Sequence, residues 1–159
     1  MLKTAKKQLK EQQAENNNVI QIKETANYDI KPQLYPYKVQ ERLSAGTGYN
    51  YDGGGLSDTV YYDEELDYDV ASYVWGDSME PKYENGEVVL IRECGFDYNG
   101  GVYAVDWDGQ SYIKKVYKED DGLRLVSINN KYSDKFAPIS EEPRIIGKVI
   151  DSFMPIEMY

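Results

Sequence analysis

A serine in a tight turn is the first candidate for nucleophilic chemistry in this chain. Ser78 lies in the segment 76–81, Gly-Asp-Ser-Met-Glu-Pro, directly after an apolar run that predicts a strand. Such a turn exposes the hydroxyl and leaves neighbouring backbone N–H groups able to face a developing oxyanion. Serine among Gly, Asp and Pro is also ordinary turn composition. The segment by itself therefore does not establish a nucleophile.

The base that would activate this serine cannot be a histidine, because the chain has none. This excludes the Ser-His-Asp and Cys-His mechanisms and histidine-ligated zinc. Any nucleophilic serine here must use Lys, Asp, Glu or Tyr as its base.

Lys114 is a candidate for that base. It lies in the run 112–117, Tyr-Ile-Lys-Lys-Val-Tyr, and by strand alternation shares a face with Tyr112 and Val116. A lysine between apolar neighbours is desolvated, which lowers its pKa and makes it usable as a base. Alternation places Lys115 in an equivalent setting on the opposite face, so it does not choose between the two. Either lysine could also extend its stem along the sheet with the charge in water.

The elements that must position these residues are predicted to be strands. Runs rich in Val, Ile and Tyr alternate with turn signals such as Asn85-Gly86 and Asp121-Gly122, and Asp108-Gly109 predicts a hairpin. The predicted strands are 59–62, 70–75, 87–92, 101–105, 112–117, 123–128 and 145–153. Many short strands without a convincing long helix predict an all-β barrel or sandwich.

The N-terminal residues, 1–38, have a different composition. Helix formers continue to Glu15, Asn16–Asn18 interrupt them, and a polar stretch with Pro32 and Pro36 follows. We interpret this segment as a helix and linker tail; a leftover terminal tail without a function is an equal alternative.

Two loops resemble ligand sites only superficially. Residues 46–55 are glycine-rich, which predicts a flexible loop, but no Gly-Lys-Ser/Thr follows, which excludes a P-loop. The acidic run 63–69 lacks the spacing and the glycine of a calcium loop, so we interpret it as a solvated charged loop. The sequence predicts no cofactor and no metal.

Charge is distributed unevenly along the chain. Residues 1–44 contain eight Lys+Arg and five Asp+Glu, whereas residues 45–159 contain ten and twenty-three. An acidic body repels a phosphate backbone, so it is not expected to bind nucleic acid by itself. The single cysteine, Cys94, the lack of an apolar run of about 18 residues and the lack of a signal sequence predict a cytoplasmic protein without a membrane anchor.

Several segments together resemble the serine-lysine self-cleaving peptidase domains of LexA, lambda-type phage repressors and UmuD. Residues 76–81 and 83–91 are similar to the nucleophile segment, and 112–116 to the general-base strand. Residues 43–46, Leu-Ser-Ala-Gly, resemble the Ala-Gly cleavage site. Residues 127–129 and 146–150 are similar to strands near the C-terminus of the family, and the resemblance covers roughly residues 40–159.

The resemblance implies a mechanism. Alignment with the family selects Lys114 as the base that activates Ser78, and the backbone N–H groups of Asp77 and Ser78 would stabilise the oxyanion. The bond cut would be Ala45–Gly46. Leu43 would be the apolar anchor on the acyl side.

The resemblance also implies a fold and a domain organisation. The fold would be mainly β, a compact barrel or β-clip like the LexA C-terminal domain and signal peptidase. A helical or disordered tail would occupy residues 1–38, a cleavage-site loop region 39–57, and the peptidase and dimerisation domain 58–159.

The biological role implied is the C-terminal domain of a phage-type transcriptional repressor, whose self-cleavage ends repression in the SOS response to DNA damage. The partners would be a second copy in a homodimer and the activated RecA filament. Operator DNA would be bound only through a helix-turn-helix domain, which this chain lacks. The alternatives are a UmuD-like accessory protein of a translesion polymerase, activated by self-cleavage, and a catalytically silent dimerisation module.

Overall fold

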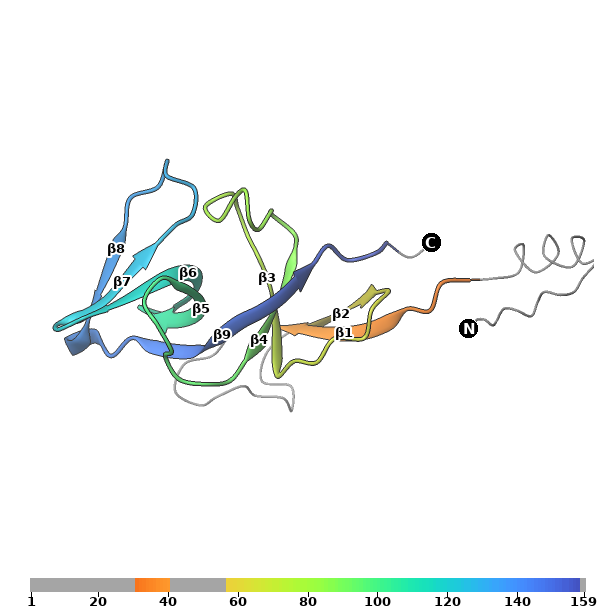
Figure 1. Ribbon diagram of the computed structural model, residues 1–159, viewed down its shortest axis with the longest axis horizontal. Helices are drawn as coiled ribbons and strands as arrows, with labels where there is room; N and C mark the ends of the chain where they lie inside the picture. The colour runs from red at the N-terminus through yellow and green to blue at the C-terminus, as the bar shows by residue number, and fades with distance from the viewer. Residues whose placement is uncertain (1–30, 41–56, 158–159) are drawn as a thin grey trace, which may run out of the picture. The chain divides into compact units, whose positions relative to one another are not determined.

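The computed structural model describes residues 31–40 and 57–157, which contain nine β-strands and one 3-10 turn (Figure 1). By its internal contacts the chain divides after Gln33, and all nine strands belong to the unit that starts at Leu34. The mainly β fold class predicted from the sequence is confirmed.

The nine strands form one sheet. In chain order they are β1 (Tyr35–Gln40), β2 (Ser57–Tyr62), β3 (Val70–Tyr73), β4 (Val88–Arg92), β5 (Gly101–Trp107), β6 (Gln110–Glu119), β7 (Gly122–Val126), β8 (Lys135–Pro138) and β9 (Arg144–Phe153), with the 3-10 turn η1 (Ile139–Glu141) before β9. Their order across the sheet is β2-β1-β3-β4-β9-β5-β6-β7-β8. Neighbours are antiparallel except β1 and β3, which run parallel.

The long strand β9 joins the two halves of this sheet. Its first residues pair with β5 and its last residues pair with β4, and it crosses between the two groups of strands in Figure 1. Register shifts between Leu90 and Ile91 on β4 and between Ala104 and Val105 on β5 accompany the crossing. Such bulges bend a sheet and increase its twist. At Gly147 a side chain would collide with the backbone of Arg92, so this close approach requires glycine.

Buried side chains form three apolar clusters. One contains residues of β3, β4, β5 and β9 together with Val74, Met79 and Tyr83, which lie between β3 and β4. Met79 is almost completely buried, and burial of such a side chain contributes about 1.5–3 kcal/mol. The turn that carries Ser78 is thus anchored to the core by its next residue. The other clusters are Tyr37, Val39, Ala71, Val88, Leu90 and Phe153, and Tyr103, Val105, Val116, Leu123, Leu125 and Ala137.

The structure differs from the sequence expectations at two short strands. β1 begins at Tyr35, inside the segment expected to be tail, because Tyr37 and Val39 alternate into the core. The body therefore begins before residue 39, and the expected boundary between residues 38 and 39 falls within a strand. β8 was not predicted either; it is a short edge strand, where Pro138 is tolerated.

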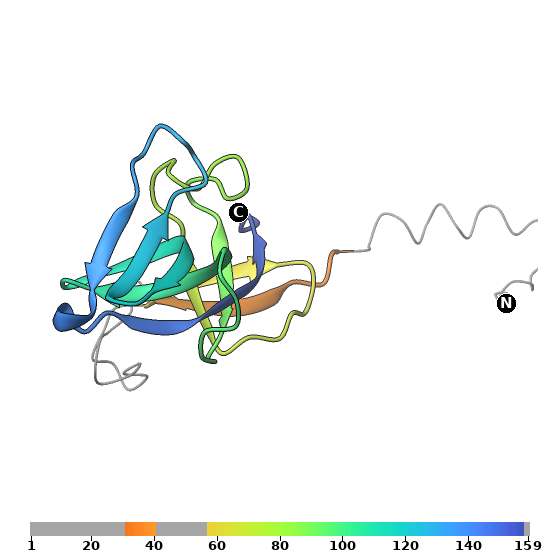
Figure 2. The same ribbon diagram turned by 60° about the vertical axis from the view of Figure 1, so that its left-hand side comes forward.

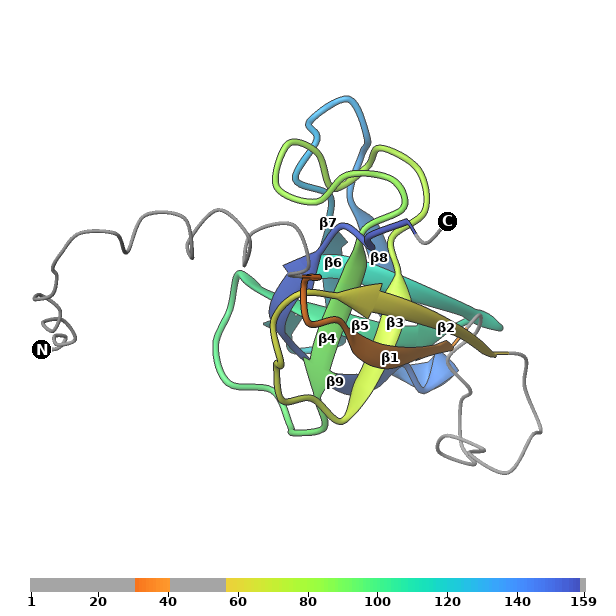
Figure 3. The ribbon, with the colours of Figure 1, turned by 90° about the vertical axis from the view of Figure 1, so that its right-hand side faces the viewer.

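Two loops lie side by side beyond the ends of the strands. The segment 74–87 follows β3, the segment 127–134 follows β7, and both lie beside each other above the sheet in Figures 2 and 3. Hydrogen bonds join them, including one from the Asn129 N–H to the Ser78 carbonyl. Ser78 is therefore held from a part of the chain distant in sequence.

Candidate active site

The turn that carries Ser78 follows β3 and is fixed at both ends. Gly76 has a φ of +80°, a conformation that favours glycine, and its N–H donates to Asn85 Oδ1 at 2.7 Å. Further along, the Tyr83 N–H donates to the Met79 carbonyl at 2.9 Å. Ser78 thus lies between a glycine bend and a buried methionine.

The structure brings Lys114 to this serine. Lys114 Nζ donates a hydrogen bond of 2.6 Å to Ser78 Oγ, and the lysine is only 8% exposed. Lys114 lies opposite Tyr103 of β5, and it is the first residue of β6 beyond the ladder with β7, which runs from Lys115 to Glu119. Lys115, which alternation could not exclude, is half-buried on the opposite face of β6. Of the two lysines, Lys114 is the one in contact with Ser78.

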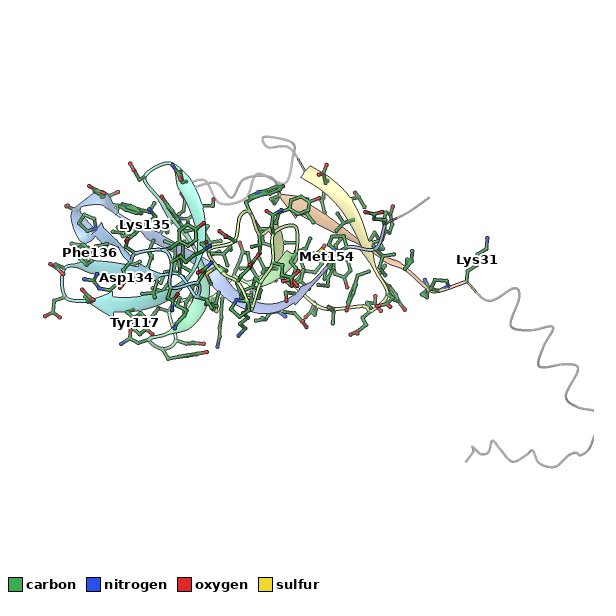
Figure 4. The ribbon with its side chains drawn as sticks, turned by 90° about the horizontal axis from the view of Figure 1, so that it is seen from above. Lys31, Tyr117, Asp134, Lys135, Phe136 and Met154 are labelled. Atoms are coloured by element: carbon green, nitrogen blue, oxygen red, sulfur yellow. The ribbon has the colours of Figure 1, made fainter. Side chains whose placement is uncertain are left out.

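Burial also changes the acidity of this lysine. Desolvation lowers the pKa of Lys114, and the positive charge of Lys135 lowers it further. Lys135 lies near Phe136 at the β8 end of the sheet (Figure 4). A lower pKa increases the neutral fraction of Lys114 at a given pH, and a neutral amine can accept the proton of Ser78.

Two hollows meet at the Ser78–Lys114 pair. One, of about 370 Å³, is lined by the end of β3, Trp75, Met79 and the residues 109–114. The other, also of about 370 Å³, is lined by Ser127, Ser133, Tyr132 and the cations Lys131 and Lys135. Ser78 and Lys114 line both hollows. A peptide bound across the pair could therefore place the residues before its reacting bond in one hollow and the residues after it in the other.

The loop 129–132 holds the Ser78 turn. The Asn129 N–H donates to the Ser78 carbonyl at 2.9 Å, and Asn129 Nδ2 donates to the Asp77 carbonyl at 3.0 Å. The Tyr132 hydroxyl donates to the Asp77 carboxylate, and Lys131 Nζ lies 3.9 Å from it. The bond from Tyr132, and after it the charge of Lys131, lower the pKa of Asp77. No chemical signal in the sequence pointed to Tyr132. Asn129 stood out only as part of a segment resembling a family strand.

The predicted cleavage-site residues, Leu43, Ala45 and Gly46, lie outside the described residues. The described chain ends at Gln40 on one side and resumes at Ser57 on the other, and these two residues pair in the β1–β2 ladder. Gln40 also lies opposite Ser72 of β3, which lines the first hollow together with the Ser78–Lys114 pair. The chain therefore leaves β1 beside a residue of the candidate site.

The acidic run 63–69 takes part in ion pairs. The Arg92 guanidinium lies 3.1 Å from a carboxylate oxygen of Asp67 and 3.4 Å from one of Asp69. The Asp69 carboxylate also accepts the Glu93 N–H at 2.9 Å. Within residues 31–40 and 57–157, no group of three or more His, Cys, Asp or Glu is arranged to hold a metal ion.

The sequence model of the Peptidase S24-like family matches residues 37–150. The chain belongs to this family. Its relatives include the LexA repressors of Thermotoga sp. (strain RQ2), 35% identical over 81 residues, and of Bacillus mycoides (strain KBAB4), 36% identical over 77 residues. These matches cover 50% and 47% of this chain but 41% and 36% of the relatives, so the chain spans about two-fifths of the LexA repressors it matches.

Membership of a peptidase family agrees with the expected enzyme class, and LexA repressors as relatives agree with the expected repressor family. In the part of the chain that the structure describes, no helix is long and apolar enough to cross a membrane.

Proposed function

We propose that this chain is a serine peptidase that cuts its own Ala45–Gly46 bond, with Ser78 as nucleophile and Lys114 as base. The observation that carries the proposal is the 2.6 Å hydrogen bond between Lys114 Nζ and Ser78 Oγ, made by a buried lysine whose pKa is lowered. Lysine supplies the base that a chain without histidine needs.

The first half of the reaction forms an acyl-enzyme. Neutral Lys114 accepts the Ser78 hydroxyl proton while Ser78 Oγ bonds to the Ala45 carbonyl carbon. The carbonyl electron pair moves to the oxygen, where the Asp77 and Ser78 N–H groups stabilise the negative charge. Protonated Lys114 then donates to the Gly46 nitrogen as the carbon–nitrogen bond breaks. The products are a Ser78–Ala45 ester and a new Gly46 amine.

The second half releases the serine. Lys114, again neutral, accepts a proton from a water molecule that attacks the ester carbon. The bond to Ser78 Oγ breaks, the lysine returns the proton to that oxygen, and Ala45 leaves as a carboxylic acid that loses its remaining proton to solvent. No metal or cofactor takes part in either half.

The pairing of Gln40 with Ser72 supports cleavage within one chain. Ser72 lines the hollow that contains the Ser78–Lys114 pair. Ala45 follows Gln40 by five positions, and five extended residues span about 16–18 Å. The scissile bond is therefore tethered within that length of a strand end that lies beside a residue of the site, and a tether of this kind replaces a bimolecular encounter by a fixed effective concentration. The first hollow offers apolar surface at Trp75 and Met79, which suits a leucine such as Leu43 as the anchor on the acyl side.

In the wider protein we assign this chain to the self-cleaving and dimerising part of a phage-type transcriptional repressor. Cleavage would inactivate the repressor after DNA damage, with activated RecA as the stimulating partner and operator DNA bound by a separate helix-turn-helix domain. The LexA repressors among its relatives support this assignment.

Cleavage of the 159-residue chain at several concentrations tests the proposal. We expect a first-order rate constant that stays the same over a hundredfold dilution, because nucleophile and substrate share one chain. Ser78→Ala should be inactive, and Ser140→Ala, which removes an exposed hydroxyl on η1, should cut like the wild type. Cleavage by Ser78→Ala at the wild-type rate would contradict the nucleophile; a rate constant proportional to concentration would contradict the intramolecular route.

A further inference from the structure

Asn129 is the residue through which a distant loop contacts the backbone on both sides of Ser78. Its N–H donates to the Ser78 carbonyl at 2.9 Å, and its side-chain Nδ2 donates to the Asp77 carbonyl at 3.0 Å. One residue thus holds two consecutive carbonyl groups of the nucleophile turn.

Holding these carbonyls also fixes the N–H groups that follow them. A peptide unit is planar and trans, so its C=O and N–H point in opposite directions. The Asp77 carbonyl and the Ser78 N–H belong to one unit. With its carbonyl bonded to Asn129, this unit cannot rotate without losing that bond. The Ser78 N–H is therefore directed away from Asn129.

The Ser78–Met79 peptide unit is held in the same way. Its carbonyl accepts the Asn129 N–H, and the Met79 side chain at its other end is buried. Ser78 therefore lies between two peptide units that the same loop residue holds, which restricts the backbone rotations that would move the Ser78 side chain away from Lys114.

The chemistry of the side chain suits an amide at this position. Asn129 Nδ2 donates to the Asp77 carbonyl while Oδ1 accepts the Lys131 N–H at 3.0 Å, and the Asn129 carbonyl accepts the Tyr132 N–H at 3.2 Å. Aspartate could accept from Lys131 but could not donate to Asp77. Alanine could do neither.

The same loop also holds the Asp77 side chain. Tyr132 donates its hydroxyl to the Asp77 carboxylate, and Lys131 Nζ lies 3.9 Å from it. These contacts reach a solvent-exposed carboxylate, whereas the contacts of Asn129 reach the backbone that contains the oxyanion donor.

We propose that Asn129 is a positioning residue of the peptidase, which fixes the peptide units on both sides of Ser78 and directs the Ser78 N–H toward the oxyanion. The inference rests on the proposed function, because an oxyanion forms only if Ser78 attacks a carbonyl. Among the described residues, Asn129 makes no hydrogen bond to Lys114; it acts through the Asp77–Ser78 backbone.

The rate of self-cleavage by the 159-residue chain, followed across pH, tests this role. We expect Asn129→Ala to lower the alkaline plateau of the rate by about 10- to 100-fold, because small misplacement of an oxyanion donor has effects of that order. The pH midpoint should stay at the wild-type value, because the substitution neither adds nor removes a charged or titratable group around Lys114; those groups are Tyr112, Tyr132, Lys131 and Lys135.

Two further variants control for charge and for folding. Asn129→Asp removes the donor to the Asp77 carbonyl and adds a negative charge, and it should be slowed. Asn130→Asp adds the same charge one position along, at an exposed side chain, and should cut like the wild type. Asn129→Ser repeats the uncharged test with a small polar side chain. Thermal unfolding of each variant shows that the rates refer to folded protein.

The outcomes separate this inference from the proposed function. Wild-type plateau rates in Asn129→Ala and Asn129→Ser, with Ser78→Ala inactive, would overturn the positioning role alone. Unfolding of every Asn129 variant, or a slower rate caused only by a shifted pH midpoint, would also overturn it. If Ser78→Ala cuts as fast as the wild type, the proposed function fails and the inference fails with it.

Discussion

Lys114 Nζ donates to Ser78 Oγ at 2.6 Å although 36 residues separate the two in sequence. The contact forms where β6 extends beyond its ladder with β7, so that Lys114 pairs with β5 only and lines two hollows. An amine in this setting is desolvated yet reachable by a bound chain. That combination allows it to act as a base.

The two adjacent lysines of β6 give a matched pair of variants. We expect Lys114→Met to reduce self-cleavage by at least about 100-fold, because general-base catalysis of this kind contributes factors of that order or more. Lys115→Met removes the same charge from the opposite face and should leave the rate within about twofold of the wild type. Gel densitometry over time measures both. If Lys115→Met lost activity and Lys114→Met did not, the base would be Lys115 and our assignment of Lys114 would be wrong.

The rate of cleavage should depend on pH through the neutral fraction of Lys114. Below the midpoint, the rate should rise about tenfold per pH unit, because one proton must leave. Burial and Lys135 lower the pKa of Lys114, so the rate should level off below the ordinary lysine value of 10.5. The neighbouring Tyr112, whose pKa burial raises, should remain protonated there. A rate that is still rising tenfold per unit at pH 10.5 would contradict a lowered pKa.

The same buried amine should destabilise the folded state. The pKa of Lys114 is lower in the folded chain than in the unfolded chain, so unfolding takes up protons between the two values. Stability contributed by this group therefore rises with pH in that window, and the full destabilisation is present below it. We expect Lys114→Met to raise the Tm by about 3 °C at neutral pH, and by less as the pH approaches 10.5. Calorimetry of both proteins at several pH values measures this; a Tm gain that grows with pH would contradict the sign.

Lys135 should tune the base without touching the serine. Replacing Lys135 by Gln removes a positive charge that lowers the pKa of Lys114, so the pH midpoint should move upward. Below the midpoint we expect the rate to fall by about twofold to fivefold, with an unchanged plateau and a smaller effect in high salt. Lys118→Gln makes the same change at an exposed position further along β6 and should have no effect. A lowered plateau in Lys135→Gln would contradict this role, because it would mean that Lys135 does more than lower the pKa of Lys114 through its charge.

Much of the sheet could be predicted from local patterns. The seven predicted runs are all strands, and Asp108-Gly109 forms a hairpin turn in which both residues have positive φ, 53° and 74°. β1 and β8 could not be predicted in this way. Each contains a proline, and their apolar positions are recognisable only once the partners Val60 and Leu123 are known to lie across from them.

The site was only partly accessible from the sequence. Ser78 could be recognised as a serine in an exposed turn, but the choice between Lys114 and Lys115 depends on which face of β6 turns toward that serine. The role we propose for Asn129 was beyond any local pattern. Asn-Asn-Lys is ordinary loop composition, and its contact with the Ser78 turn spans 51 or more residues of sequence.

Intact-mass spectrometry of the purified chain after incubation at alkaline pH tests the central claim most directly. The account predicts two fragments whose masses place the cut between Ala45 and Gly46, formed by the wild type and absent from Ser78→Ala. Fragments whose masses place the cut at any other bond, or the same fragments from Ser78→Ala at the wild-type rate, would contradict it.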